Sequence, residues 1–423
     1  MPHGGTLGFC LVKSPAGVFS GTRLVIEFGT MKITRRILAV LVLLLAPLTL
    51  LLAAQKPHKM HSKTTKYIAY VGTYTSKTGS KGIYSYRFDT TTGRLTDGAV
   101  AAETADPSFV AADASGKFLY AVNEVGEFQG QKSGAVSAFS IDQTTAKLTL
   151  LNQVASKGAG TCYVSLDKTG KFVLVASYDS GNVAVFPVQK DGSLGAATAL
   201  VQHTGTGADK ERQEGPHAHW IEVSPDNRFA LAVDLGLDEI LVYKFDASKG
   251  TLTPNDPPFI KLAPRSGPRH ITFHPNGKFV FLTSELNSTV TALSYDAKKG
   301  VLRALGTLST LPKEASGHND TAEIAVSPSG KFLYVSNRGH DSIALFAIDP
   351  AQGTLTWTGD FSTRGRTPRH FTIDPSGEFL LAENHESNTI VIFKIDPTTG
   401  GLTPTGQTVE NPAPVDITFV AAR

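Results

Sequence analysis

A twelve-residue pattern recurs along the chain at intervals of about fifty residues, and this repeat limits the possible folds more than any other feature of the sequence. Each copy has an alternating or apolar run on both sides of a Gly- or Asn-containing turn, as in "HPNGKFVFLTSE". Such a pattern predicts two antiparallel strands joined by a tight turn. The turn residues of the six copies fall at positions 116, 170, 227, 277, 330 and 377.

A second recurring element follows each copy. It is a short apolar run such as "DSIALFAID", and then a turn that ends in leucine, such as "QGTL". A unit therefore contains four short strands separated by turns rich in Gly, Pro, Asp and Asn. Four antiparallel strands repeated at about fifty residues are typical of a propeller blade. Residues 67–423 divide into seven such units, so the predicted fold class is all-β, a seven-bladed β-propeller of four-stranded antiparallel blades.

The two ends of this region complement each other. Residues 67–75 ("YIAYVGTYT") match the second strand of a unit and lack a first strand. Residues 414–420 ("PVDITFV") match a first strand and lack a second. We therefore expect the N- and C-terminal strands to pair in one blade and to close the ring, which removes exposed sheet edges.

The segment before the repeats has a different character. Residues 31–54 combine a basic start, a long apolar run and an Ala-Ala ending, which is the layout of a secretory signal peptide. A membrane anchor is the alternative, because the run approaches the length that spans a bilayer. We expect 1–30 to be a non-native upstream extension, 31–54 a signal peptide, 55–66 a linker and 67–423 the propeller domain. The expected location is periplasmic or secreted, or cytoplasmic if the leader is not used.

Composition excludes several classes of partner. The net charge of +3 gives no case for nucleic-acid binding. Two cysteines, Cys10 and Cys162, cannot form a disulfide framework, and no Cys/His cluster suggests zinc. We expect no metal, no cofactor, no stable membrane partner after signal cleavage, and a monomer. Cys162 lies at a mouth position without a recognised base, so we expect an inert buried thiol.

Polar residues gather at one end of the predicted hairpins. In an antiparallel blade, the start of the first strand and the end of the second lie on the same face, so these positions from all blades ring one mouth of the channel. One unit places Arg269, His270 and Glu285 there. Other units contribute further polar side chains, namely His217, His219, Glu323, Asn337, Arg338, Arg369 and His370. A non-repeating polar rim on a repeating framework is where a functional site is expected.

At these residues the sequence resembles the lactonase-family β-propellers, which include propeller-type 6-phosphogluconolactonase and carboxymuconate cyclase. The resemblance rests on "YVGTYT", "GPHAHWIEVSPDNRFALAVDLG", "GPRHITFHPNGKFVFLTSELN", "VSNRGHDSIALF" and "TPRHF", and covers the chain after residue 67. It implies a seven-bladed fold, a small lactone substrate, and active residues that fall on His219, Arg269, Glu285 and Arg338. The predicted export signal departs from a family that mostly acts on a sugar phosphate inside the cell.

Opening a lactone requires a water nucleophile, a base and positive charge near the developing oxyanion. Arg269 and Arg338 suit a carboxylate, a phosphate or the oxyanion. Glu285 and His219 are both candidate bases, and the residues alone do not choose between them. We expect His217, His270, Glu323, Asn337 and Arg369 to contact or select the substrate. A structural ion pair is the alternative for Arg269 and Glu285.

Two other functions are compatible with the same polar residues at the mouth of the channel. The first is a non-catalytic propeller that binds a ligand or a protein at this mouth. The second is a cycloisomerase that forms or opens a muconolactone. The Arg, His and Glu side chains favour a hydrolase that opens a sugar lactone, as in 6-phosphogluconolactonase, whereas the leader peptide favours the binding function.

Overall fold

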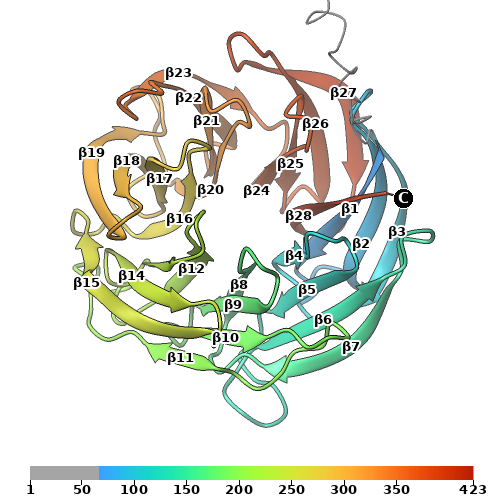
Figure 1. The fold of residues 1–423 in the computed structure, drawn as a ribbon. Coiled ribbons are helices and arrows are strands. Elements are labelled where there is room, and N and C mark those ends of the chain that lie inside the picture. Colours follow the sequence, from blue (N-terminus) through green and yellow to red (C-terminus); the bar gives the residue numbers. More distant parts are fainter. Residues whose placement is uncertain (1–65, 423) are drawn as a thin grey trace, which may run out of the picture. The chain divides into compact units, whose positions relative to one another are not determined.

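The computed structural model describes residues 66–422, which form seven four-stranded antiparallel sheets set as blades around a central channel (Figure 1). These residues contain no helix, and hence none able to cross a membrane. The prediction of a seven-bladed β-propeller is therefore confirmed. The expected signal peptide lies outside the described residues, and it stays a prediction.

The blades are numbered in chain order, and the first-named strand of each lines the channel (Figure 1). Blade 1 contains β28 (Pro414–Ala421), β1 (Lys66–Thr73), β2 (Gly82–Asp89) and β3 (Arg94–Glu103). Blade 2 contains β4 (Val110–Ala112), β5 (Phe118–Asn123), β6 (Ala135–Ile141) and β7 (Leu148–Ala155). Blade 3 contains β8 (Thr161–Leu166), β9 (Phe172–Ser177), β10 (Asn182–Pro187) and β11 (Ala199–Gln202). Blade 4 contains β12 (Ala218–Val223), β13 (Phe229–Asp234), β14 (Glu239–Asp246) and β15 (Thr251–Lys261).

The remaining three blades follow the same order. Blade 5 contains β16 (Pro268–Phe273), β17 (Phe279–Ser284), β18 (Thr289–Asp296) and β19 (Val301–Ser309). Blade 6 contains β20 (Asp320–Val326), β21 (Phe332–Arg338), β22 (Ser342–Ile348) and β23 (Leu355–Ser362). Blade 7 contains β24 (Pro368–Ile373), β25 (Phe379–Asn384), β26 (Thr389–Ile395) and β27 (Leu402–Glu410).

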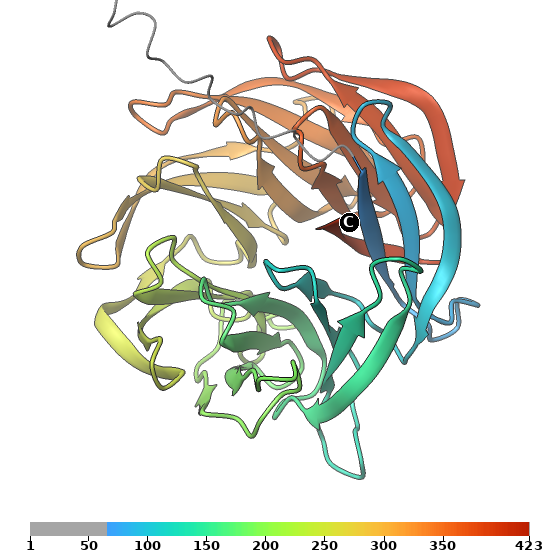
Figure 2. The same cartoon turned by 45° about the vertical axis from the view of Figure 1, so that its right-hand side comes forward.

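Blade 1 closes the ring with strands from both ends of the repeat region. β1 pairs with β28 in an antiparallel register that runs from Tyr67↔Ala421 to Thr73↔Pro414 (Figure 2). Its other edge pairs with β2. The expected pairing of the terminal strands is confirmed, and β1 has no free edge that could recruit another chain.

The repeated Phe and Gly of the sequence pattern meet between neighbouring blades. The Phe that follows the first turn of a blade packs under the Gly of the last turn in the next blade. The pairs are Phe118–Gly192, Phe172–Gly250, Phe229–Gly300, Phe279–Gly353, Phe332–Gly400 and Phe379–Gly93. A Cβ added at any of these glycines would lie 2.3–2.7 Å from the aromatic ring. The repeat is therefore maintained by the contact between blades as well as by the turn itself.

We expect Gly353→Ala to lower the free energy of unfolding by about 2 kcal/mol, because a positive φ and an overpacked contact each cost roughly that order. Gly353 has a φ of 72°, and its added Cβ would lie 2.3 Å from Phe279. The control is Gly306→Ala in β19, where no atom lies within 4 Å of the added Cβ. Urea unfolding of both variants checks the contact, and equal midpoints would contradict it.

Candidate active site

The inner strands β12, β16 and β24 each carry a β-bulge near their first residue, and the bulge places polar residues at the mouth. The register of β12 skips His219, that of β16 skips Arg269, and that of β24 skips Arg369. A bulge sets two consecutive residues against one on the partner strand and re-aims their side chains. Consecutive pairs such as Arg269 and His270 can therefore both contribute to the site.

Glu285 lies at the centre of a cluster of three arginines. Its Oε2 lies 2.8 Å from Nη2 of Arg338 and 3.2 Å from Nε of Arg269, and its Oε1 lies 2.6 Å from Nη2 of Arg212. Burial opposes ionisation of Glu285, but the charges of Arg338 and Arg269 outweigh it and hold the pKa of Glu285 well below its usual range. Three guanidinium groups face one carboxylate, so the cluster keeps uncompensated positive charge.

Backbone carbonyl groups fix two of these arginines. Arg269 donates from Nη1 to the carbonyl oxygen of Ala322 at 2.8 Å, and Arg338 donates from Nη2 to that of Thr321 at 3.0 Å. Burial, with the nearby charges of Arg369 and Arg338, lowers the pKa of Arg269 to about 10, and the side chain stays cationic at neutral pH. The expected meeting of Arg269, Glu285 and Arg338 is thus present in the structure.

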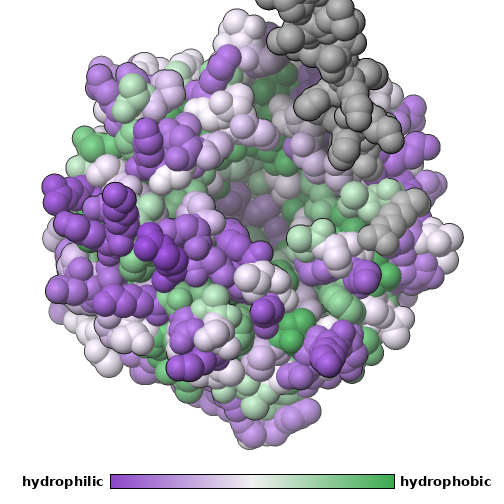
Figure 3. Space-filling model, viewed as in Figure 1, coloured by the Kyte–Doolittle hydropathy of each residue, from purple (hydrophilic) through white to green (hydrophobic). Residues whose placement is uncertain are grey.

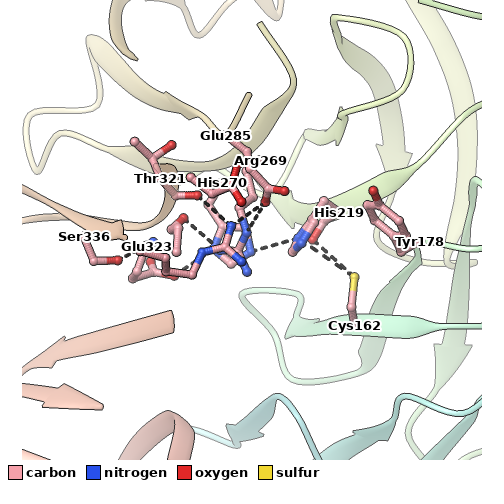
Figure 4. A network of polar contacts seen from close by, with 12 residues as sticks. Cys162, Tyr178, His219, Arg269, His270, Glu285, Thr321, Glu323 and Ser336 are labelled. Atoms are coloured by element: carbon pink, nitrogen blue, oxygen red, sulfur yellow. Dashed lines mark hydrogen bonds and ion pairs between the residues drawn. The ribbon is translucent and has the colours of Figure 1, made fainter. Parts of the chain in front are cut away.

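A row of three hydrogen-bonding side chains crosses from blade 4 to blade 6 beside this cluster (Figure 4). Nδ1 of His219 lies 3.2 Å from Nε2 of His270, and Nδ1 of His270 lies 2.7 Å from Oε2 of Glu323. Burial and the charge of Arg269 lower the pKa of both histidines well below the usual value, so both are neutral at pH 7. Burial raises the pKa of Glu323 to about 8.

The far end of the row meets a buried acidic group. Nε2 of His370 lies 3.3 Å from both Glu323 Oε2 and Asp416 Oδ1, and its Nδ1 lies 2.8 Å from Glu383 Oε2. Burial and repulsion between the carboxylates raise the pKa of Glu383 and Asp416 well above their usual range. Burial lowers the pKa of His370 to about 3, so this histidine is neutral.

Arg369 differs from the other arginines of the mouth. Its guanidinium lies over the ring of Tyr74, 5.2 Å from the ring centre, and in the described part of the chain it forms no ion pair within 4.0 Å. The nearby Glu124 is hydrogen-bonded by Tyr74 at 2.8 Å and by Ser108 at 2.5 Å. The charges of Glu124 and Glu285 favour the cationic form of Arg369, but neither carboxylate lies within ion-pair distance of its guanidinium.

A cavity of about 10 Å³ lies among the residues of the mouth. Its lining residues are Ser108, Phe109, Glu124, Cys162, Arg269, His270, Arg369, His370 and Val415. That volume holds one water molecule at most, so this cavity does not enclose a sugar-sized ligand. Figure 3 shows the propeller hollowed at its centre, with hydrophilic side chains deep in the hollow.

Two residues that were expected to contact substrate are engaged elsewhere. His217 stacks on Tyr178 with ring centres 4.3 Å apart, and its Nδ1 lies 3.0 Å from the Tyr178 carbonyl oxygen. Asn337 is fully buried and bonds Ser342 of β22 and Thr310, which lies in the segment between β19 and β20. Asn337 thus stabilises the framework of the blades, and its expected contact with the substrate stays a prediction. Cys162 is buried, and burial raises the pKa of its thiol, in keeping with the expected inert thiol.

Sequence reasoning missed four members of the site. Arg212 comes from a charged loop, "GADKERQEG", that has no counterpart in the other units, and this interruption of the repeat was the available signal. Asp416 and Glu124 stand at rim positions of the repeat, and their acidic character was the signal. Glu383 lies inside β25, a strand buried along its whole length, so the alternation of polar and apolar residues did not distinguish it from a core residue.

The fold and the site together define a class: a seven-bladed β-propeller with a positively charged, histidine-containing pocket at one mouth of its channel. The chain belongs to the lactonase family of seven-bladed β-propellers, because the model of that family matches residues 68–419. Among residues 66–422, no group of three or more His, Cys, Asp or Glu is arranged to hold a metal ion.

Named relatives resemble the chain over most of its length. A 6-phosphogluconolactonase from Bacillus subtilis is 41% identical over 307 residues, which cover 73% of this chain and 85% of the relative. A periplasmic gluconolactonase from Pseudomonas aeruginosa has a solved structure with a TM-score of 0.79 and 34% identity, covering 85% of this chain and 100% of that one. A candidate 6-phosphogluconolactonase from Bacteroides fragilis gives a TM-score of 0.79 and 39% identity, covering 85% and 99%.

Proposed function

We propose that this chain is a hydrolase that opens a sugar lactone by attack of water at the channel mouth. The observation that carries the proposal is the neutral, buried His219 beside the positive cluster of Arg269 and Arg338. No other residue of 66–422 forms a hydrogen bond with its Nε2, and this nitrogen is accessible to solvent. This nitrogen can therefore accept a proton from water. The names of the relatives support the same reaction.

The mechanism distributes the steps among these residues. Nε2 of His219 removes a proton from water while the oxygen adds to the lactone carbonyl carbon. The guanidinium groups of Arg269 and Arg338 stabilise the oxyanion, because their charge exceeds that of the single carboxylate Glu285. The intermediate expels the ring oxygen as an alkoxide, which takes the proton back from His219. The product is the open hydroxy acid.

The geometry favours His219 over Glu285 as the base. Both carboxylate oxygens of Glu285 face guanidinium groups, and its pKa is held well below its usual range by the charges of Arg338 and Arg269, which outweigh the effect of burial. A carboxylate so strongly stabilised has little tendency to take a proton from water. We assign Glu285 the role of holding the arginines in place.

A panel of lactones with and without a phosphate group tests the function. We expect acid release on ring opening of gluconolactone, its 6-phosphorylated form or both, and no hydrolysis of linear esters of matched charge. Binding of these lactones without turnover would overturn the hydrolase and leave a ligand-binding propeller. The predicted leader and the periplasmic relative support an exported enzyme. N-terminal sequencing of the protein from its host tests that location.

Arg369 is the residue we expect to recognise an anionic substituent, because it forms no ion pair with a carboxylate of the described protein. We expect Arg369→Gln to raise KM for a phosphorylated lactone about 10- to 100-fold, since a hydrogen bond to a charged group contributes about 1.5–3 kcal/mol. KM for the uncharged lactone should change little. The control is Arg366→Gln, which removes an exposed arginine from the same segment. An equal rise in KM for both substrates would contradict this assignment.

A further inference from the structure

We infer that Glu323 and His270 are positioning residues that set the tautomer of His219, and so decide whether Nε2 of His219 can accept a proton. The row formed by Glu323, His270 and His219 connects the inner strands of three consecutive blades, β20, β16 and β12. The role of this row in turnover rests on the proposed lactone hydrolysis. The coupling between the protonation of Glu323 and the tautomers of His270 and His219 does not depend on that reaction.

The row is held tightly and is shielded from solvent. Its two contacts measure 2.7 Å and 3.2 Å, and His270 and His219 are 2% and 5% exposed. Phe109 and Tyr163 pack edge-on against the ring of His270, with ring centres 6.0 Å and 5.2 Å away. The packing of Phe109 and Tyr163 prevents the ring of His270 from flipping, which would exchange its two nitrogens. Water cannot replace either hydrogen bond of the row unless this packing opens.

A neutral imidazole has one N–H donor and one nitrogen acceptor, so the row allows two arrangements of its protons. When Glu323 is ionised, it accepts from Nδ1 of His270, and Nε2 of His270 accepts from Nδ1 of His219. Nε2 of His219 then carries a free electron pair. When Glu323 is protonated, it donates to Nδ1 of His270, both rings change tautomer, and Nε2 of His219 carries a hydrogen. One proton on Glu323 thus removes the base two rings away.

The groups around Glu323 set the balance between the two arrangements. Nε2 of His370 from β24 and Nδ1 of His270 from β16 both face its Oε2, and Arg269 adds a favourable charge from β16. Glu383 on β25 and Asp416 on β28 are acidic neighbours, and burial with mutual repulsion raises their pKa, which favours their neutral forms. Burial raises the pKa of Glu323 to about 8, so both arrangements are populated near neutral pH.

The ionised arrangement also helps the chemistry. When His219 takes a proton from water, positive charge develops on a ring that burial and Arg269 otherwise keep neutral. Ionised Glu323 offsets that charge through His270, in the way a buried carboxylate supports the histidine of a catalytic triad. Arg269, by contrast, opposes the charge. The row therefore explains how a histidine with a lowered pKa can still work as a base.

Nitrogen NMR of the full chain, labelled with ¹⁵N-histidine, tests the coupling without any substrate. The signals of His219 and His270 are assigned by comparison with His219→Asn and His270→Gln. Between pH 6 and pH 10 we expect Nε2 of His219 to change from a protonated to an unprotonated shift, with a midpoint near pH 8. In Glu323→Gln the change should be absent. A tautomer of His219 that is the same at every pH in the wild type would overturn the inference.

Kinetics with a lactone from the panel supply the second measurement. In the wild type we expect kcat to rise with pH through a midpoint near 8. In Glu323→Gln we expect kcat to fall about 10- to 100-fold, as is typical when the partner of a functional histidine is removed, and the rise to disappear. The control Glu222→Gln removes a carboxylate of β12 that pairs with surface Lys168 at 2.8 Å, and it should keep the wild-type profile.

The two measurements separate the inference from the proposed function. A tautomer change with no hydrolysis of any lactone would support the row and overturn the hydrolase. Hydrolysis with a fixed tautomer, or a Glu323→Gln enzyme that keeps the wild-type pH profile, would overturn the row and leave the hydrolase in place.

Discussion

His219→Asn is expected to lower kcat for lactone opening by about two to four orders of magnitude, because a positioned general base contributes roughly that factor. Asparagine places an amide where Nδ1 of His219 meets His270, so the hydrogen bond of 3.2 Å has a substitute. It places nothing at Nε2, the proposed proton acceptor. The variant should therefore fold normally and bind substrate with a similar KM. Stopped-flow measurement of acid release gives kcat directly.

The matched control for this variant is His274→Asn. His274 is also a buried histidine; its Nδ1 accepts from the backbone of Asn276 at 3.1 Å, and its Nε2 lies 2.9 Å from the carbonyl oxygen of Gly330. It lies at the turn between β16 and β17, at the opposite end of the hairpin from the mouth. Its replacement should lower the melting temperature and leave kcat unchanged. If His219→Asn lost less than tenfold in kcat, His219 would not be the base.

The repeat predicted the fold because it encodes contacts between blades as well as strands. At six of the seven blade boundaries a Phe of one unit packs against a Gly of the next, and the number of units sets the number of blades. The complementary ends, "YIAYVGTYT" and "PVDITFV", predicted the closing pair β1 and β28 for the same reason. These contacts could be predicted because the residues that form them recur at fixed positions of the repeat.

The site was predicted only in part, because its members meet across blades. Arg269 and Glu285 belong to one hairpin, so strand geometry alone placed them together. The contact between His270 and Glu323 joins two blades at atoms whose positions depend on the bulges of β16 and β20. No sequence pattern fixes a bulge that skips one or two residues. Arg212 comes from a loop without a repeat counterpart, so its reach to Glu285 could not be read from the periodicity.

Glu285→Gln is expected to lower the free energy of unfolding by about 3–5 kcal/mol at pH 7, which is the usual effect of removing one partner from a buried charge group. Glu285 is 4% exposed and Arg269 is 3% exposed, so Arg269 cannot be rehydrated when the carboxylate is lost. The arginines would then repel one another at the mouth. Chemical unfolding at pH 7 measures this effect, and kcat should fall as the guanidinium groups move.

Arg212→Gln is the control from the same cluster. Arg212 bonds the other oxygen of Glu285 at 2.6 Å, but its side chain is 39% exposed. Partly exposed pairs contribute about 0–1 kcal/mol, so this variant should change stability by no more than about 1 kcal/mol. A similar loss in Arg212→Gln and Glu285→Gln would show that burial does not determine the energetics of the cluster.

The pH dependence of stability separates a structural carboxylate from a catalytic base. Burial alone would raise the pKa of Glu285, but Arg338 and Arg269 hold it well below the ordinary value of 4.5 in the folded state. A group whose folded pKa is depressed stabilises the protein above its unfolded pKa, and that contribution is lost as the pH falls toward the folded pKa. The difference in unfolding free energy between wild type and Glu285→Gln should therefore be constant above about pH 5.5 and shrink between about pH 5 and pH 3. If Glu285 were instead a base that titrates near neutral pH, the difference in unfolding free energy would not shrink between about pH 5 and pH 3. Glu285→Gln would then lose kcat at unchanged stability. That result would make Glu285, rather than His219, the general base.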